Sequence, residues 1–110
     1  MVKMNFNVVI DENKYTNKFF KSFKSYEEDI KDNIYNKLEE IINFKTHKIK
    51  TAYHLKRKNN TIYEYKIVVK NYNFRAAYIQ VGNNIEVFFI SITTIKKDFV
   101  KLLENTNLLD

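Results

Sequence analysis

Eight cationic side chains in the second half of the chain have the residue types needed for chemistry on a phosphate. They lie on or beside predicted strands and are Lys56, Arg57, Lys58, Lys66, Lys70, Arg75, Lys96 and Lys97. Arg75 is the most informative, because it lies inside an apolar strand, where a guanidinium is costly to bury unless it faces water or an anion. It could bind a phosphate or pair internally with Glu64 or Glu86, and the sequence leaves both arrangements open.

The positive charge of the chain is concentrated around these residues. The formal net charge is +6, and residues 45–75 contain nine basic and one acidic side chain, while the segments on either side are close to neutral. Lysine-rich codon usage would raise the total charge but would spread it over the whole chain. A localised basic segment is typical of proteins that bind a polyanion, most often nucleic acid.

Residue types that other common sites require are missing. The two histidines, His47 and His54, have no cysteine or carboxylate at ligand spacing, so we predict no metal site. The single glycine, Gly82, excludes a glycine-rich nucleotide-binding loop. Carboxylates are nearly absent from residues 45–85, which argues against a hydrolase with paired carboxylates. We expect no cofactor.

The cations must be positioned by a sheet. Residues 63–92 alternate apolar and other side chains in three successive runs, separated by polar turns near residues 71–73 and 82–84. This pattern predicts an antiparallel meander. Further alternating runs at residues 4–10 and 50–57 predict a four- to five-stranded, mainly antiparallel sheet.

Helices are predicted to form a cover for this sheet. A phenylalanine-rich stripe and an isoleucine-rich stripe, in residues 11–24 and 25–44, indicate a two-helix hairpin, and a short helix follows residue 94. The predicted N-caps are Asp11, Ser25 in a capping box with Glu28, and Thr93 or Thr94. Residues 104–110 are predicted to fray. The fold class is therefore α+β, with one domain over residues 1–110.

Cellular location is restricted by composition. The chain has no cysteine and no apolar run long enough to span a bilayer, and its first residues lack the features of a signal peptide. We expect a cytoplasmic protein without a membrane partner.

The stretch Tyr63–Ile92 carries a pattern of the form Y-x-[IL]-x-[VL], a short turn, [YF]-R-x-x-Y, a second turn and [IV]-x-[VL]-x-x-I-S-[VI]. The matching residues are Tyr65, Ile67, Val69, Phe74, Arg75, Tyr78, Ile85, Val87, Ile90, Ser91 and Ile92. With the order of elements, this stretch resembles the RelE/ParE superfamily of bacterial type II toxins. The resemblance implies a ribosome-dependent endoribonuclease that cuts mRNA, and a cognate antitoxin protein that neutralises its basic groove.

The same resemblance implies roles for individual residues. Arg75 would hold the scissile phosphate, and Lys66 would act as a base or charge stabiliser while the substrate's 2′-hydroxyl attacks. Ile95 replaces the arginine that the family places after its last strand, so Lys96 or Lys97 would supply that charge without the bidentate fork of arginine. Lys101 stands where the family has a tyrosine or histidine. The expected catalytic residues are Arg75, Lys66 and Lys97, and the expected nucleic-acid-binding residues are Lys56, Arg57, Lys58, Lys70 and Lys96.

Three functions stay open at this point. The first is a RelE-like mRNA interferase, which the pair of Lys66 and Arg75 favours. The second is a ParE-like toxin that poisons a topoisomerase without cutting RNA, which the departures after Ile92 favour. The third is a non-catalytic phage- or plasmid-type module on the same scaffold that binds nucleic acid or a protein.

Overall fold

A mixed sheet of five strands forms the centre of the fold. The computed structural model describes residues 3–110. Across the sheet, the strands lie in the order β1 (Asn7–Ile10), β5 (Asn84–Ser91), β4 (Tyr72–Val81), β3 (Asn60–Val69) and β2 (Ile49–Arg57). β1 runs parallel to β5, and the other neighbouring pairs are antiparallel. The predicted α+β class and the mainly antiparallel sheet are confirmed.

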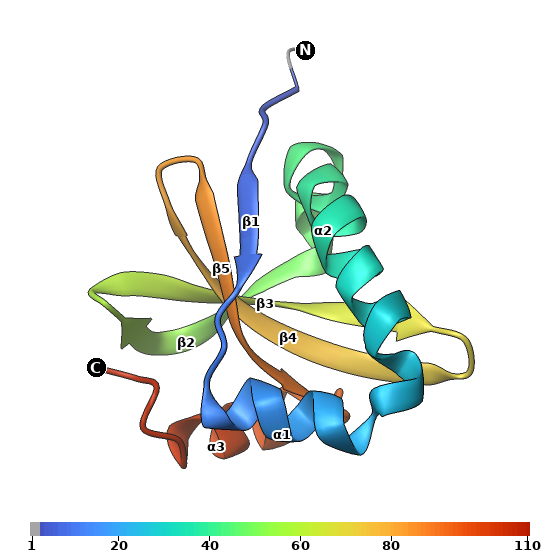
Figure 1. The fold of residues 1–110 in the computed structure, drawn as a ribbon. Coiled ribbons are helices and arrows are strands. Elements are labelled where there is room, and N and C mark those ends of the chain that lie inside the picture. The colour runs from blue at the N-terminus through green and yellow to red at the C-terminus, as the bar shows by residue number, and fades with distance from the viewer. Residues whose placement is uncertain (1–2) are drawn as a thin grey trace.

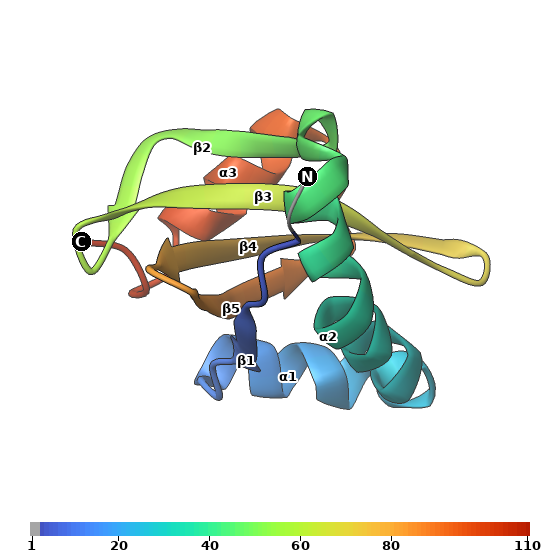
Figure 2. The same cartoon turned by 90° about the horizontal axis from the view of Figure 1, so that it is seen from above.

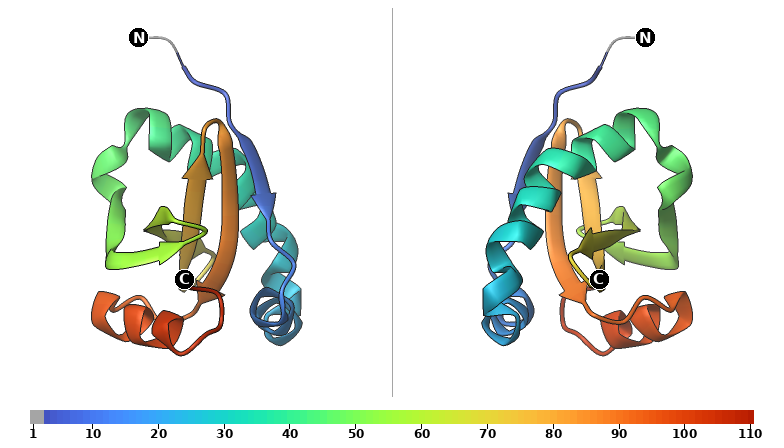
Figure 3. Two further views of the ribbon diagram at one scale, coloured as in Figure 1. Left: turned by 90° about the vertical axis from the view of Figure 1, so that its left-hand side faces the viewer. Right: turned by 90° about the vertical axis from the view of Figure 1, so that its right-hand side faces the viewer.

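Helices cover the sheet on both sides. They are α1 (Lys14–Ser22), α2 (Glu27–Phe44) and α3 (Lys96–Glu104), and two 3-10 turns, η1 (Lys24–Tyr26) and η2 (Thr46–Lys48), flank α2. α1 and α2 meet at a wide angle through η1 (Figure 1), and the side views place α1 and α3 on opposite sides of β5 (Figure 3). None of the helices in residues 3–110 is long and apolar enough to cross a membrane.

Successive side chains along a strand point to opposite faces of the sheet, and both faces carry buried apolar side chains. On one face, Tyr65 and Ile67 pack with the fully buried Ile30, Ile34 and Leu38 of α2, as the predicted stripe requires. The opposite face packs against α3 and forms a second core, whose buried members are Ala52, Ile62, Ala77, Ile79, Phe88, Phe89, Phe99, Val100, Leu103 and Leu108. The sequences of strands with both faces covered in this way are nearly continuous apolar runs.

The β3–β4 hairpin extends past the end of β2 (Figure 2). β2 pairs with β3 only as far as Ile49, which lies opposite Tyr65, whereas β3 continues its pairing with β4 to Val69. Residues 66–69 of β3 therefore form an edge that has no neighbouring strand on the β2 side within residues 3–110.

The predicted N-caps were wrong for all three helices. Asn13, not Asp11, caps α1: its Oδ1 accepts from the amides of Tyr15 at 2.9 Å and Thr16 at 3.0 Å. α2 leads directly out of η1 with Tyr26 as its N-cap residue, so no capping box forms at Ser25. Ile95 precedes α3 without a side-chain cap. The three acidic residues in the first turn of α2 interact favourably with its N-terminal dipole instead.

The C-terminal segment is ordered, contrary to the prediction that it frays. Asp110 accepts hydrogen bonds from the amides of Lys58 at 2.6 Å and Asn59 at 2.7 Å, and its own amide donates to the Lys56 carbonyl at 2.9 Å. Lys58 and Asn59 both have positive φ, as a tight hairpin turn requires. The end of the chain is thus fastened to the β2–β3 turn.

Candidate nucleic-acid interface

Arg75 and Glu64 form an ion pair. Lys66 lies opposite Arg75 in the β3–β4 register, and Glu64 lies on the same face of β3 two residues earlier. Arg75 Nε donates to Glu64 Oε1 at 2.8 Å, and Nη2 lies 2.7 Å from the same oxygen. Arg75 Nη1 donates to the Thr94 carbonyl at 3.2 Å. Of the two arrangements that the sequence left open, internal pairing is the one observed.

The carboxylate of this pair also binds a second cation. Glu64 is fully buried, and Lys96 Nζ lies 3.2 Å from its Oε1 and donates to the Thr51 carbonyl. The second carboxylate oxygen, Oε2, has no hydrogen-bond partner among residues 3–110. Two cations share one carboxylate, so the cluster of Glu64, Arg75 and Lys96 keeps a net positive charge.

The other two expected catalytic residues are exposed. Lys66 has no carboxylate within 4.0 Å in the described part of the chain, and it lies opposite Arg75 across the strand pair. Lys97 is exposed in the first turn of α3, and no hydrogen bond or ion pair among residues 3–110 links it to Arg75 or Lys66. The fold therefore brings Lys66 and Arg75 together, whereas Lys97 has no contact that joins it to them.

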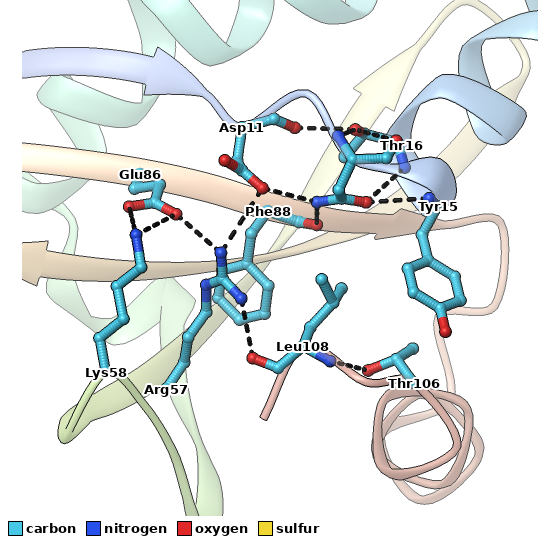
Figure 4. Close-up of polar contacts among 10 residues, drawn as sticks. Asp11, Tyr15, Thr16, Arg57, Lys58, Glu86, Phe88, Thr106 and Leu108 are labelled. Atoms are coloured by element: carbon cyan, nitrogen blue, oxygen red, sulfur yellow. Dashed lines mark hydrogen bonds and ion pairs between the residues drawn. The ribbon is translucent and has the colours of Figure 1, made fainter. Parts of the chain in front are cut away.

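Arg57 belongs to an internal network with Asp11 and Glu86 (Figure 4). Its Nη2 lies 3.1 Å from Glu86 Oε1 and 3.5 Å from Asp11 Oδ2, and its Nη1 donates to the Leu108 carbonyl at 2.8 Å. The guanidinium also lies 4.8 Å from the centre of the Phe88 ring. Lys58 pairs with the other oxygen of Glu86 at 3.1 Å but is 59% exposed. Arg57 therefore connects the β2–β3 hairpin to β5 and to the C-terminal segment.

Carboxylates from other parts of the chain fold onto the basic segment. Lys70 pairs with Asp29 of α2 at 3.4 Å, in addition to the pairs that Asp11 and Glu86 make. Among the expected nucleic-acid-binding residues, Lys56 is exposed and has no carboxylate within 4.0 Å in residues 3–110. The net positive charge counted along residues 45–75 is thus larger than the positive charge that stays unpaired on the surface.

Four lysines gather in a groove between α2 and the unpaired edge of β3. The groove has a volume of about 600 Å³ and is lined by Asn33, Lys37, Glu40, Ile41, Lys45, Lys48, Lys66 and Val68. We call it the lysine groove. Its one carboxylate, Glu40, lies 3.9 Å from Lys45, a weak contact for an ion pair on the surface. Four ammonium groups around one carboxylate give the groove an excess of positive charge, which would attract a polyanion.

Lys37, Lys45 and Lys48 were missed as site residues by sequence reasoning. Lys45 and Lys48 belong to the basic segment, so its charge excess was a signal for them. Lys37 comes from the middle of an acidic helix, and only the packing of α2 beside β3 brings it to Lys66. Among residues 3–110, no group of three histidine and carboxylate side chains is arranged to hold a metal ion.

Comparisons with known protein families, with curated proteins and with solved structures give no match. The resemblance to the RelE/ParE superfamily consequently depends on the motif residues in Tyr63–Ile92 and on the order of elements, and it stays a prediction.

Proposed function

We propose that the protein binds single-stranded RNA along the lysine groove. The observation that carries the proposal is the gathering of Lys37, Lys45, Lys48 and Lys66 from separate elements around one groove with a single carboxylate. Neutralising phosphates with lysine releases counterions from the nucleic acid, and this release supplies most of the affinity in sequence-independent binding.

We further propose that the bound strand is mRNA on the ribosome and that the protein cleaves it as a RelE-like toxin. In this reaction, the 2′-hydroxyl of the substrate loses its proton to water while its oxygen attacks the adjacent phosphorus. The bond to the 5′-oxygen of the next nucleotide breaks, and that oxygen takes a proton from water. The products are a 2′,3′-cyclic phosphate and a 5′-hydroxyl. Lys66 is the exposed cation beside Arg75, and its ammonium would stabilise the charge that develops on the phosphate.

Arg75 can contribute to this reaction without leaving Glu64. A guanidinium has five N–H donors, and the contacts to Glu64 and Thr94 use three of them, which leaves one on each terminal nitrogen. The side chain is 13% exposed, so it is not fully enclosed by the core. In this role Glu64 fixes the orientation of the guanidinium, and the outer hydrogens meet the phosphate oxygens.

The second candidate is a non-catalytic nucleic-acid-binding module on the same scaffold. The pairing of Arg75 with a fully buried carboxylate favours it, because the guanidinium already has an internal partner. A ParE-like toxin is a related alternative on the same scaffold, which would bind a topoisomerase without cutting RNA. In both toxin versions, the location is the cytoplasm and a cognate antitoxin protein would cover the lysine groove.

RNA binding is tested first, with a double charge reversal in the groove. Lys37→Glu with Lys48→Glu should weaken binding of a short oligouridylate and lower the slope of log affinity against log salt, by about 0.7 for each phosphate that the variant no longer neutralises. Lys18→Glu with Lys101→Glu is the matched control, because both lysines are exposed and lie outside the groove. Equally weakened binding in the two double variants would show that only net charge matters and would exclude the groove.

Cleavage is tested by induced expression in bacteria. The parent protein should arrest growth and produce mRNA fragments with cyclic phosphate ends, and Lys66→Ala should abolish both effects. Arg75→Ala should do the same, but it leaves Glu64 with one cation fewer, so its folding must be verified by circular dichroism. RNA binding without growth arrest or fragments would support the non-catalytic module instead.

A further inference from the structure

We propose that Tyr53 is a stacking platform for an unpaired base of single-stranded RNA. The inference rests on the proposed function, because it adds a contact for the same strand beyond the lysine groove. It is carried by an exposed aromatic ring on a strained bulge, next to the cluster of Glu64, Arg75 and Lys96.

β2 bulges outward at Tyr53. Thr51 lies opposite Tyr63 and Lys56 lies opposite Thr61, so residues 52–55 of β2 face Ile62 alone. Ala52 is fully buried in the second core, and the Thr51 carbonyl accepts from Lys96. These two contacts fix the base of the bulge, and the additional residues project from the edge of the sheet.

Tyr53 has a backbone conformation that an aromatic residue rarely adopts. Its φ is 50°, in the left-handed region that glycine and asparagine occupy at much lower cost. Strain of this kind persists only where the surrounding structure imposes it, and it is concentrated at functional sites. Packing does not explain the residue, because 57% of Tyr53 is exposed to solvent. The bulge presents the ring to solvent instead of contributing it to the core.

A cation already lies beside one side of the Tyr53 ring. Lys96 Nζ lies 4.8 Å from the centre of the Tyr53 ring, while the same ammonium lies 3.2 Å from Glu64 Oε1. The exposed fraction of Tyr53 leaves ring surface open on which a base can stack. A cation beside an aromatic ring is the combination that proteins use for single strands, since the base stacks and the neighbouring phosphate is attracted.

A short series of neighbouring residues leads from the lysine groove to Tyr53. Lys66 lines the groove, and Glu64 lies two residues before it on the same face of β3. Lys96 pairs with Glu64, and Tyr53 lies beside Lys96. Neighbouring residues on one face of a strand are about 7 Å apart, so only a few side chains separate Tyr53 from Lys66. A strand of RNA in the groove can therefore continue along the exposed edge of the sheet and place a base on Tyr53.

The test compares two ligands that differ only in their bases. A fluorescently labelled oligouridylate and an abasic ribose-phosphate oligomer of equal length are titrated into the parent protein, Tyr53→Phe and Tyr53→Ala. Tyr53→Ala should bind the oligouridylate about 5- to 150-fold more weakly than the parent protein does, and its affinity for the abasic oligomer should stay unchanged. Tyr53→Phe should bind both ligands as the parent does, because it keeps the ring.

Further variants separate stacking from folding and from the proposed function. Tyr53→Gly should bind the oligouridylate as weakly as Tyr53→Ala does while melting at a higher temperature, because glycine relieves the strain at positive φ. Tyr35→Ala removes an exposed tyrosine of α2 and should change nothing. If Tyr53→Ala and the parent bind oligouridylate equally, but the groove variants weaken it, Tyr53 is not a platform and the proposed function stands. If the parent binds neither ligand, both proposals fail.

Discussion

Glu64 binds Arg75 through one oxygen, Oε1, which lies 2.8 Å from Nε and 2.7 Å from Nη2 of the guanidinium. The same oxygen lies 3.2 Å from Lys96 Nζ. A single buried carboxylate on β3 therefore joins β4 to the start of α3. Because a buried charge is tolerated only with partners, the three side chains should behave as one unit in folding.

The first prediction concerns the charge of Glu64. Glu64→Gln keeps the shape of the side chain but leaves Arg75 and Lys96 without their shared anion, so we expect the free energy of unfolding to fall by about 3 kcal/mol or more. Urea denaturation followed by circular dichroism measures this change. Glu104→Gln is the matched control, because Glu104 is exposed at the end of α3, and its effect should stay within about 0.5 kcal/mol. A decrease for Glu64→Gln as small as that of the control would contradict the role of the cluster.

The second prediction concerns the contact between α2 and the sheet. Ile34 is fully buried in the core beneath α2, so Ile34→Asp would bury an unpaired carboxylate at a cost of several kcal/mol and should unfold the domain. Tyr35→Asp introduces the same charge at the next position, where the side chain is 45% exposed, and it should leave the fold intact. Thermal melting of the two variants distinguishes them, and similar melting curves would mean that α2 does not cover the core.

The fold was largely predictable because it follows from local patterns of side chains. The period-2 alternation in residues 63–92 and the isoleucine stripe of α2 each depend on neighbours in sequence, and both were confirmed. Helix N-caps were not predictable in the same way, because several polar residues lie near each helix start and tertiary contacts select among them. Asn13, for example, also donates to the Phe88 carbonyl of β5 at 2.9 Å.

The candidate site was less predictable because its charges are compensated across long sequence distances. Arg57 pairs with Asp11 and Glu86, and Lys70 pairs with Asp29. No local pattern in the sequence encodes these pairs. The lysine groove and the strained bulge at Tyr53 likewise depend on where β2 stops pairing with β3, which alternation alone does not specify.

The third prediction concerns the C-terminal segment. Asp110 accepts hydrogen bonds from two amides of the β2–β3 turn, so Asp110→Ala should lower the free energy of unfolding by about 1 kcal/mol, since these exposed amides can bind water instead. Asp110→Asn keeps one acceptor oxygen and should be destabilised less. Hydrogen exchange at Lys58 and Asn59 should accelerate in the alanine variant. A variant indistinguishable from the parent in both measurements would mean that the segment frays in solution.

The last prediction concerns Tyr65, whose hydroxyl is buried without a hydrogen-bond partner among residues 3–110. Burial, with a smaller contribution from Tyr78, raises the pKa of the Tyr65 hydroxyl above its ordinary value of about 10. Above that pH, the unfolded chain releases the tyrosine proton while the folded protein keeps it. The contribution of Tyr65 to the free energy of unfolding is therefore fully present below pH 10, and it should fall by about 1.4 kcal/mol per pH unit above that pH.

Tyr65→Phe should reduce the decrease of stability with pH. Because this variant removes an unpaired buried hydroxyl, it should not destabilise the protein at neutral pH. Denaturation curves at several alkaline pH values measure the slope, with Tyr35→Phe as the exposed control; equal slopes in the parent and Tyr65→Phe would contradict the burial of this hydroxyl.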